Sequence, residues 1–142
     1  MQVEDLYQAG HEIASHTVTH SHPAGYTADR WAREIGGQAD LLSTLGRIPR
    51  AQITGVRAPF LQTGGDAMYS VLAGAGLQYD SSIPSPRTSP ALWPYTLDRE
   101  LPHRCPLPPC PARPHPGIWE IPMTLMDDEM GGHGCPMLDA CR

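Results

Sequence analysis

Short strand-like segments alternate with amphipathic helical patterns over the first part of the chain. Strand patterns occupy residues 11–15, 53–57 and 76–83, and helical patterns lie between them at 28–45 and 67–75. Thr27 and Asp66, which precede the two helices, are residue types that commonly cap a helix N-terminus. Strands and helices that alternate at this spacing predict an α/β fold with parallel strands.

The remainder of the chain has a different character. Residues 84–116 are rich in proline and lack any periodicity, which predicts a long loop. One further strand pattern follows at 117–123, and the tail from 127 onward is irregular. The 142 residues suffice for a single domain. Residues 3–10 resemble the end of a helix already under way, so we expect the chain to be part of a longer protein.

Charge and cysteine content narrow the class of protein. A net charge of -5 disfavours a nucleic-acid partner, and no apolar run approaches the roughly 20 residues that span a bilayer. Four cysteines allow three pairings. The two short-range pairs, Cys105–Cys110 and Cys135–Cys141, are our preferred pairing, and they imply an oxidising, secretory compartment. Four reduced thiols in a cytosolic protein are the alternative.

Four of the seven histidines fall within residues 10–23. In an extended chain, His16 and His20 would lie roughly 13 Å apart and could not share a metal ion. Positions i and i+4 of a helical turn, by contrast, lie on one face. We therefore expect the chain to turn directly after Ser15, so that His16 and His20 form a metal-binding pair. Two hydrogen-bonded surface histidines are the alternative interpretation.

Arg57 ends the second strand pattern and is followed by Ala58 and Pro59. The carboxyl edge of parallel strands is where α/β proteins place their functional sites. A guanidinium there stays charged and is suited to orienting a carboxylate. A solvated arginine at a strand end is the alternative.

Taken together, two short motifs resemble those of the polysaccharide deacetylase family, which contains the NodB homology domain. These are H-T-V-T-H at 16–20 and R-A-P-F at 57–60. Several flanking segments are similar to the chitin deacetylases of insects and other animals, including Y-D-S-S-I at 79–83, L-W-P-Y-T-L-D at 92–98 and I-W-E-I-P-M at 118–123. The resemblance implies a partial distorted (β/α) barrel of the polysaccharide deacetylase type with a long Pro-rich loop. It also implies removal of N-acetyl groups from chitin or a related N-acetylglucosamine polymer with a divalent metal, usually zinc.

The resemblance also implies roles for individual residues. His16 and His20 would be metal ligands, Arg57 would orient a catalytic aspartate, and the backbone N–H of Phe60 would stabilise the oxyanion. Asp80 would belong to the fourth family motif, and Trp93 would line the sugar groove. Trp31 and Trp119 are expected in the core.

Two family motifs are missing from residues 1–142. The pair of aspartates that should precede the histidine motif is absent, as is the leucine–histidine strand that should follow Trp119. We therefore expect a single partial catalytic domain, secreted and inactive alone. The alternatives are a non-catalytic chitin-binding or extracellular matrix protein descended from a deacetylase, and a secreted metal-binding module with no sugar role.

Overall fold

The computed structural model describes residues 2–85, 92–126 and 135–137 and has a mixed α/β architecture. Its helices, in chain order, are α1 (Gln2–Gln8), α2 (Ala28–Trp31), the π-helix η1 (Ala32–Gly36), α3 (Gly37–Gly46), the 3-10 turns η2 (Arg50–Gln52) and η3 (Pro59–Leu61), and α4 (Asp66–Leu72). Its strands are β1 (Gly55–Val56), β2 (Tyr79–Asp80), β3 (Tyr95–Thr96) and β4 (Trp119–Glu120).

The four strands form one sheet in the order β1-β2-β4-β3. β1, β2 and β4 run parallel, as the alternation of strands and helices predicts, and β3 is antiparallel to β4. The strand expected at residues 11–15 is reduced to a parallel bridge between Ser15 and Val56 beside β1. Each predicted strand is therefore found in its expected place, but it is shorter than its apolar pattern.

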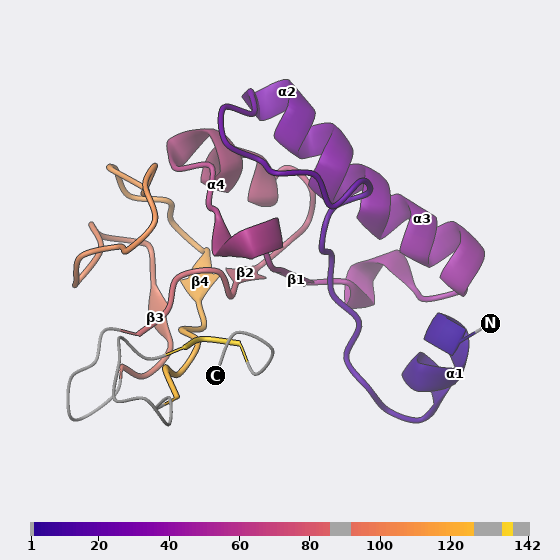
Figure 1. Ribbon diagram of the computed structural model, residues 1–142. Coiled ribbons are helices and arrows are strands. Elements are labelled where there is room, and N and C mark those ends of the chain that lie inside the picture. The colour runs from indigo at the N-terminus through magenta and orange to yellow at the C-terminus, as the bar shows by residue number, and fades with distance from the viewer. Residues whose placement is uncertain (1, 86–91, 127–134, 138–142) are drawn as a thin grey trace.

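α2, η1 and α3 form a nearly continuous rod that lies with α4 on one side of the sheet, whereas α1 lies apart beside the far end of α3 (Figure 1). Thr27 caps α2 as predicted, because its side chain accepts a hydrogen bond from the Arg30 N–H. The expected cap at Asp66 is wrong, since Gly65 occupies the N-cap and Asp66 is the first residue of α4. The Asp66 carboxylate instead accepts a hydrogen bond from the Ala112 N–H at 3.1 Å.

The core lies between the sheet and this helix layer. Trp31 is fully buried, as expected, but Trp119 is 47% exposed, so its predicted place in the core is wrong. Alternation along β4 explains the difference, because neighbouring side chains on a strand point to opposite faces. Glu120 points into the core near Tyr69 of α4, which leaves Trp119 on the opposite, open face of the sheet.

The proline-rich segment is not wholly a loop, because β3 lies within it. Residues 86–91 fall outside the described part. Cys105 and Cys110 form the predicted disulfide, whereas Cys141, and with it the predicted Cys135–Cys141 pair, lies outside the described residues. The segment is anchored to the start of α4, where the His115 imidazole contacts the Asp66 carboxylate at 2.8 Å.

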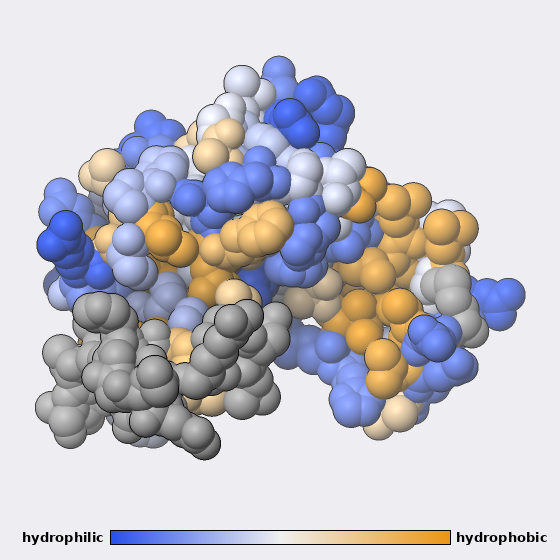
Figure 2. All heavy atoms as spheres, in the orientation of Figure 1, coloured by the Kyte–Doolittle hydropathy of each residue, from blue (hydrophilic) through white to orange (hydrophobic). Residues whose placement is uncertain are grey.

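Apolar side chains also reach the surface on the side of α1 and α3, as Figure 2 shows. Three exposed leucines lie on these two helices, namely Leu6, Leu41 and Leu45. Among the residues that the structure describes, no helix has both the length and the apolar character needed to span a membrane.

Candidate functional site

The site is built along the carboxyl edge of the parallel strands. His16 follows the Ser15 bridge, Arg57 follows β1, and Ser81 follows β2. Parallel strands end at the same edge of a sheet, so three residues far apart in the sequence become neighbours. The sequence-based expectation that the histidine turn would lie beside Arg57 is met.

The histidine turn brings the two imidazoles together, with the ring centroids of His16 and His20 4.8 Å apart. The turn is not the helical one we expected. Thr17 and His20 have φ angles of 70° and 50°, and the Thr17 hydroxyl accepts a hydrogen bond from the His20 N–H at 3.2 Å. The β-branched residues between the histidines disfavour a helix, and two left-handed residues give a tighter reversal.

A backbone carbonyl sets the tautomer of His16. His16 Nδ1 lies 2.7 Å from the carbonyl oxygen of Arg57. A carbonyl can only accept, so Nδ1 holds a proton, and in a neutral ring Nε2 is the nitrogen that has the lone pair. A hydrogen bond of this kind to the second ring nitrogen is typical of metal-binding histidines. His16 is therefore oriented and electronically suited to be a ligand.

The Arg57 side chain is fixed at the same edge. Its Nε donates to the Ser81 carbonyl and its Nη2 donates to Ser81 Oγ, both at 2.9 Å. Ser81 Oγ in turn donates to the Ile121 carbonyl at 2.8 Å. A surface hollow of about 260 Å³ is lined by Ala14, Ser15, His16, Val56, Arg57, Tyr79 and Ser81. The Arg57 guanidinium and the His16 imidazole, each fixed by hydrogen bonds, therefore both line this hollow.

Phe60 lies on the other side of the histidine pair. Its φ of 57° is unusual for an aromatic residue, and the residue is 50% exposed. The ring centroid lies 5.1 Å from that of His20 and 5.4 Å from that of His22, against which it stacks. His22 lies outside both short motifs, so sequence analysis did not assign it a role.

The sequence is similar to known proteins over nearly its whole length. Residues 1–79 match the polysaccharide deacetylase family. The chain belongs to the polysaccharide deacetylase family. It is 40% identical over 144 residues to chitin deacetylase 8 of Bombyx mori, an alignment that covers 98% of this chain and 38% of that protein. It is 34% identical over 151 residues to chitin deacetylase 1 of the same organism, covering 98% of this chain and 28% of that protein. The chain thus spans roughly a third of the length of these relatives.

In this deacetylase-family chain, Asp80 lies beneath the site edge rather than at its surface. Its side chain is fully buried and accepts hydrogen bonds from Tyr69 at 2.7 Å and from Ser82 at 2.5 Å. Ser82 Oγ also accepts the Ala58 N–H at 2.8 Å. Asp80 therefore reaches the turn that follows Arg57 through Ser82, and not by direct exposure to a ligand.

Glu120 is a buried partner that the sequence did not reveal. It is aligned with Asp80 across β2 and β4 and has no exposed surface. Burial, followed by the neighbouring Asp80 charge, raises the pKa of Glu120 to about 11. Burial also raises the pKa of Asp80. Burial and the neighbouring charge thus favour the protonated form of Glu120 beside Asp80.

Trp93 lies just before β3 and is 84% exposed. An aromatic ring so open to solvent is available for stacking on a ligand, as the family resemblance implies. The structure does not bury this ring against the core, in contrast to Trp31.

The imidazoles of His16 and His20 are candidate metal ligands, but two side chains are fewer than a metal site needs. Within residues 2–85, 92–126 and 135–137, no group of three or more histidine, cysteine, aspartate or glutamate side chains could hold a metal ion. His16 and His20 would supply two of the three or more protein ligands that metal sites normally use.

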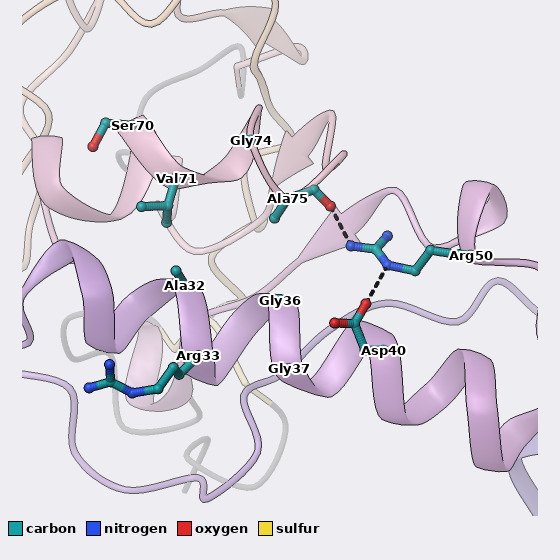
Figure 3. A pocket seen from close by; sticks show the side chains of 10 residues that line it. All are labelled: Ala32, Arg33, Gly36, Gly37, Asp40, Arg50, Ser70, Val71, Gly74 and Ala75. Atoms are coloured by element: carbon teal, nitrogen blue, oxygen red, sulfur yellow. Dashed lines mark hydrogen bonds and ion pairs between the residues drawn. The ribbon is translucent and has the colours of Figure 1, made fainter.

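A larger hollow, of about 750 Å³, lies on the helix side, between the η1–α3 rod and α4 (Figure 3). Backbone and small side chains line most of it, and its charged side chains are Arg33, Asp40 and Arg50. Arg50 is already bound to Asp40 at 3.1 Å and to the Ala75 carbonyl. This hollow lacks the converging donors of the histidine edge.

Proposed function

We propose that the protein is a metal-dependent hydrolase that removes N-acetyl groups from chitin-like polymers of N-acetylglucosamine. The main support is the convergence of His16, His20 and Arg57 at one sheet edge, in a chain 40% and 34% identical to two chitin deacetylases. We further propose that the sheet is part of the distorted (β/α) barrel typical of the family, and that the protein is secreted. The Cys105–Cys110 disulfide supports secretion.

His16 Nε2 and the ring of His20 would hold the metal, and zinc is the ion usual in the family. When bound, such an ion supplies Lewis acidity toward an acetamide carbonyl and lowers the pKa of a water. The remaining steps belong to the chain's own groups. Arg57, fixed by Ser81, would orient a carboxylate, and the Phe60 N–H would donate to the oxyanion of the acetamide. Trp93 would stack on a sugar ring, and Asp80 would keep the Arg57 turn in place through Ser82.

The 142-residue chain alone is proposed to be inactive, because His16 and His20 offer only two donors and no carboxylate base lies beside them in the described part. The test is acetate release from chitin oligomers with added Zn²⁺. The chain alone should release none, whereas the chain extended by the regions that its relatives possess should be active. Robust turnover by the chain alone would refute the inactivity.

Matched variants of the extended protein test the assignments. His16→Ala and Arg57→Ala should each lower turnover at least about 100-fold, and only His16→Ala should also weaken Zn²⁺ binding. His11→Ala, an exposed histidine outside the turn, is the control. If the extended protein binds the oligomers but releases no acetate, the non-catalytic chitin-binding alternative replaces the hydrolase. If it binds Zn²⁺ but not the oligomers, the metal-binding module replaces the hydrolase.

A further inference from the structure

The backbone of the histidine turn needs support from outside, because two of its residues are in an uncommon conformation. Thr17 and His20 both have positive φ, and Thr17 is a β-branched residue, for which this is rare. Such conformations cost on the order of 1–3 kcal/mol each and persist only where the surroundings hold them. The described structure shows what holds this turn.

A single carboxylate binds the middle of the turn. Glu34 Oε2 accepts the Thr19 N–H at 3.0 Å, and Glu34 Oε1 accepts the Thr19 hydroxyl at 2.8 Å. The backbone carbonyl of Glu34 also accepts the Val18 N–H at 3.1 Å. Glu34 is only 6% exposed, so these bonds are sheltered from solvent.

The start of the turn is bound by the same stretch of helix. Ser15 Oγ donates to the Ile35 carbonyl at 2.9 Å, and Gln38 Oε1 accepts from the His16 N–H. All these partners lie on η1 and the first turn of α3. π-helical turns inside longer helices are frequent at functional sites. In Figure 1 the segment before α2 runs along this rod.

We infer that Glu34 is a positioning residue for the metal pair, acting through Thr19 on the turn between His16 and His20. This inference rests on the proposed function, because it assumes that the pair binds a metal. The carboxylate touches neither imidazole. Its two oxygens fix the backbone between them, and so fix the separation and direction of the rings before any ion arrives.

Glu34→Gln is the direct test, since it keeps the side-chain shape. The amide oxygen can still accept the Thr19 N–H, but the amide N–H can then only donate to the Thr19 hydroxyl, so two charge-assisted bonds become two weaker neutral ones. We expect the dissociation constant for Zn²⁺ to rise about tenfold or more, the usual cost of losing an outer-shell partner. It is measured on the full 142-residue chain from NMR ring signals of His16 and His20 during Zn²⁺ titration.

Controls separate positioning from general stability. Asp29→Asn removes an exposed carboxylate from α2 and should leave the dissociation constant within about twofold, as should Thr19→Ser, which retains the hydroxyl. Thr19→Val removes the hydroxyl that Glu34 binds and should weaken Zn²⁺ binding. It is the test variant if Glu34→Gln does not fold. A merely structural role would lower the melting temperature with no change in Zn²⁺ affinity measured well below it.

The outcomes are distinguishable. If Zn²⁺ shifts both ring signals in the wild type, but Glu34→Gln and Thr19→Val bind it equally well, the positioning role is wrong and the proposed metal pair stands. If Zn²⁺ leaves the His16 and His20 signals of the wild type unchanged, both the pair and the inference fail.

Discussion

At the scale of single residues, the buried pair Asp80 and Glu120 should make the free energy of unfolding depend on pH. Two desolvated carboxyls side by side cannot both ionise at neutral pH. The pKa of Glu120 is raised from 4.5 to about 11, first by burial and then by the Asp80 charge. Between these values the folded chain holds a proton that the unfolded chain has released. The free energy of unfolding should therefore fall as pH rises through this window.

Replacing Glu120 by glutamine should remove this dependence, because an amide has the same shape and no charge to acquire. We expect Glu120→Gln to match the wild type near pH 5 and to exceed its free energy of unfolding by more than about 1 kcal/mol at pH 8. Urea unfolding at pH 5, 6.5 and 8 measures this. Glu100→Gln, an exposed site, is the control. Parallel pH profiles for wild type and Glu120→Gln would show that Glu120 is ionised in the fold.

Sequence reasoning could place His16 and Arg57 together because each stands where a parallel strand ends, and it could add His20 because a turn after Ser15 brings it back to His16. It could not identify Glu120, since a glutamate between Trp119 and Ile121 suggests a polar residue on an exposed face. Only the alignment of β4 with β2 shows that Glu120 is the inward residue and Trp119 the outward one. Glu34 was missed for a similar reason, because its partner Thr19 is 15 residues away along the chain and meets it only in the fold.

At the scale of elements, helix positions followed from caps and apolar spacing, whereas strand lengths did not. Apolar patterns at 53–57 and 76–83 predict strands, but a ladder extends only as far as its neighbour offers partners, and here β1 and β2 pair over two residues. Gly36 and Gly37 do not end the helix predicted at 28–45. The chain instead passes through the π-helix η1 and continues into α3.

The loop before α4 passes so close to α2 that only glycine fits at one point. A Cβ on Gly64 would lie 2.1 Å from Trp31 Nε1 and 2.8 Å from Met68 Cβ, and both side chains are fully buried. Gly64→Ala should therefore destabilise the fold by about 2 kcal/mol or more. Gly74→Ala is the control, since its nearest atom would be the Val71 carbonyl oxygen at 3.6 Å. Thermal unfolding of the two variants compares them, and equal melting temperatures would contradict this packing.

At the scale of the whole molecule, polar contacts around α4 add to the β2–β4 pairing in joining the early and late parts of the chain. Thr63 Oγ1 donates to the Pro109 carbonyl at 2.6 Å, and Asp66 binds both the Ala112 N–H and the His115 ring. The sequence predicted a loop here and no long-range anchor, because proline-rich segments have no periodicity to indicate a partner. The family match ends at residue 79, so this anchoring lies partly beyond it.

Asp66→Ala should release this anchor while keeping α4 helical, since alanine suits a first helical position. We expect the Ala112 amide to exchange with solvent at least about threefold faster, as measured by hydrogen exchange with NMR, because its acceptor is lost. Asp40→Ala, which breaks a distant ion pair with Arg50, should leave the exchange rate of that amide unchanged.

Although burial raises the pKa of Asp66, hydrogen bonds from His115 and the backbone outweigh it and lower this pKa below 3.8. The carboxylate thus stabilises the fold above pH 3.8, and this contribution is lost as pH falls through the lowered pKa. The protection factor of the wild-type amide should then approach that of Asp66→Ala in acid. A wild-type factor that stays constant down to pH 2 would show that the Asp66 charge does not anchor the segment that contains Ala112.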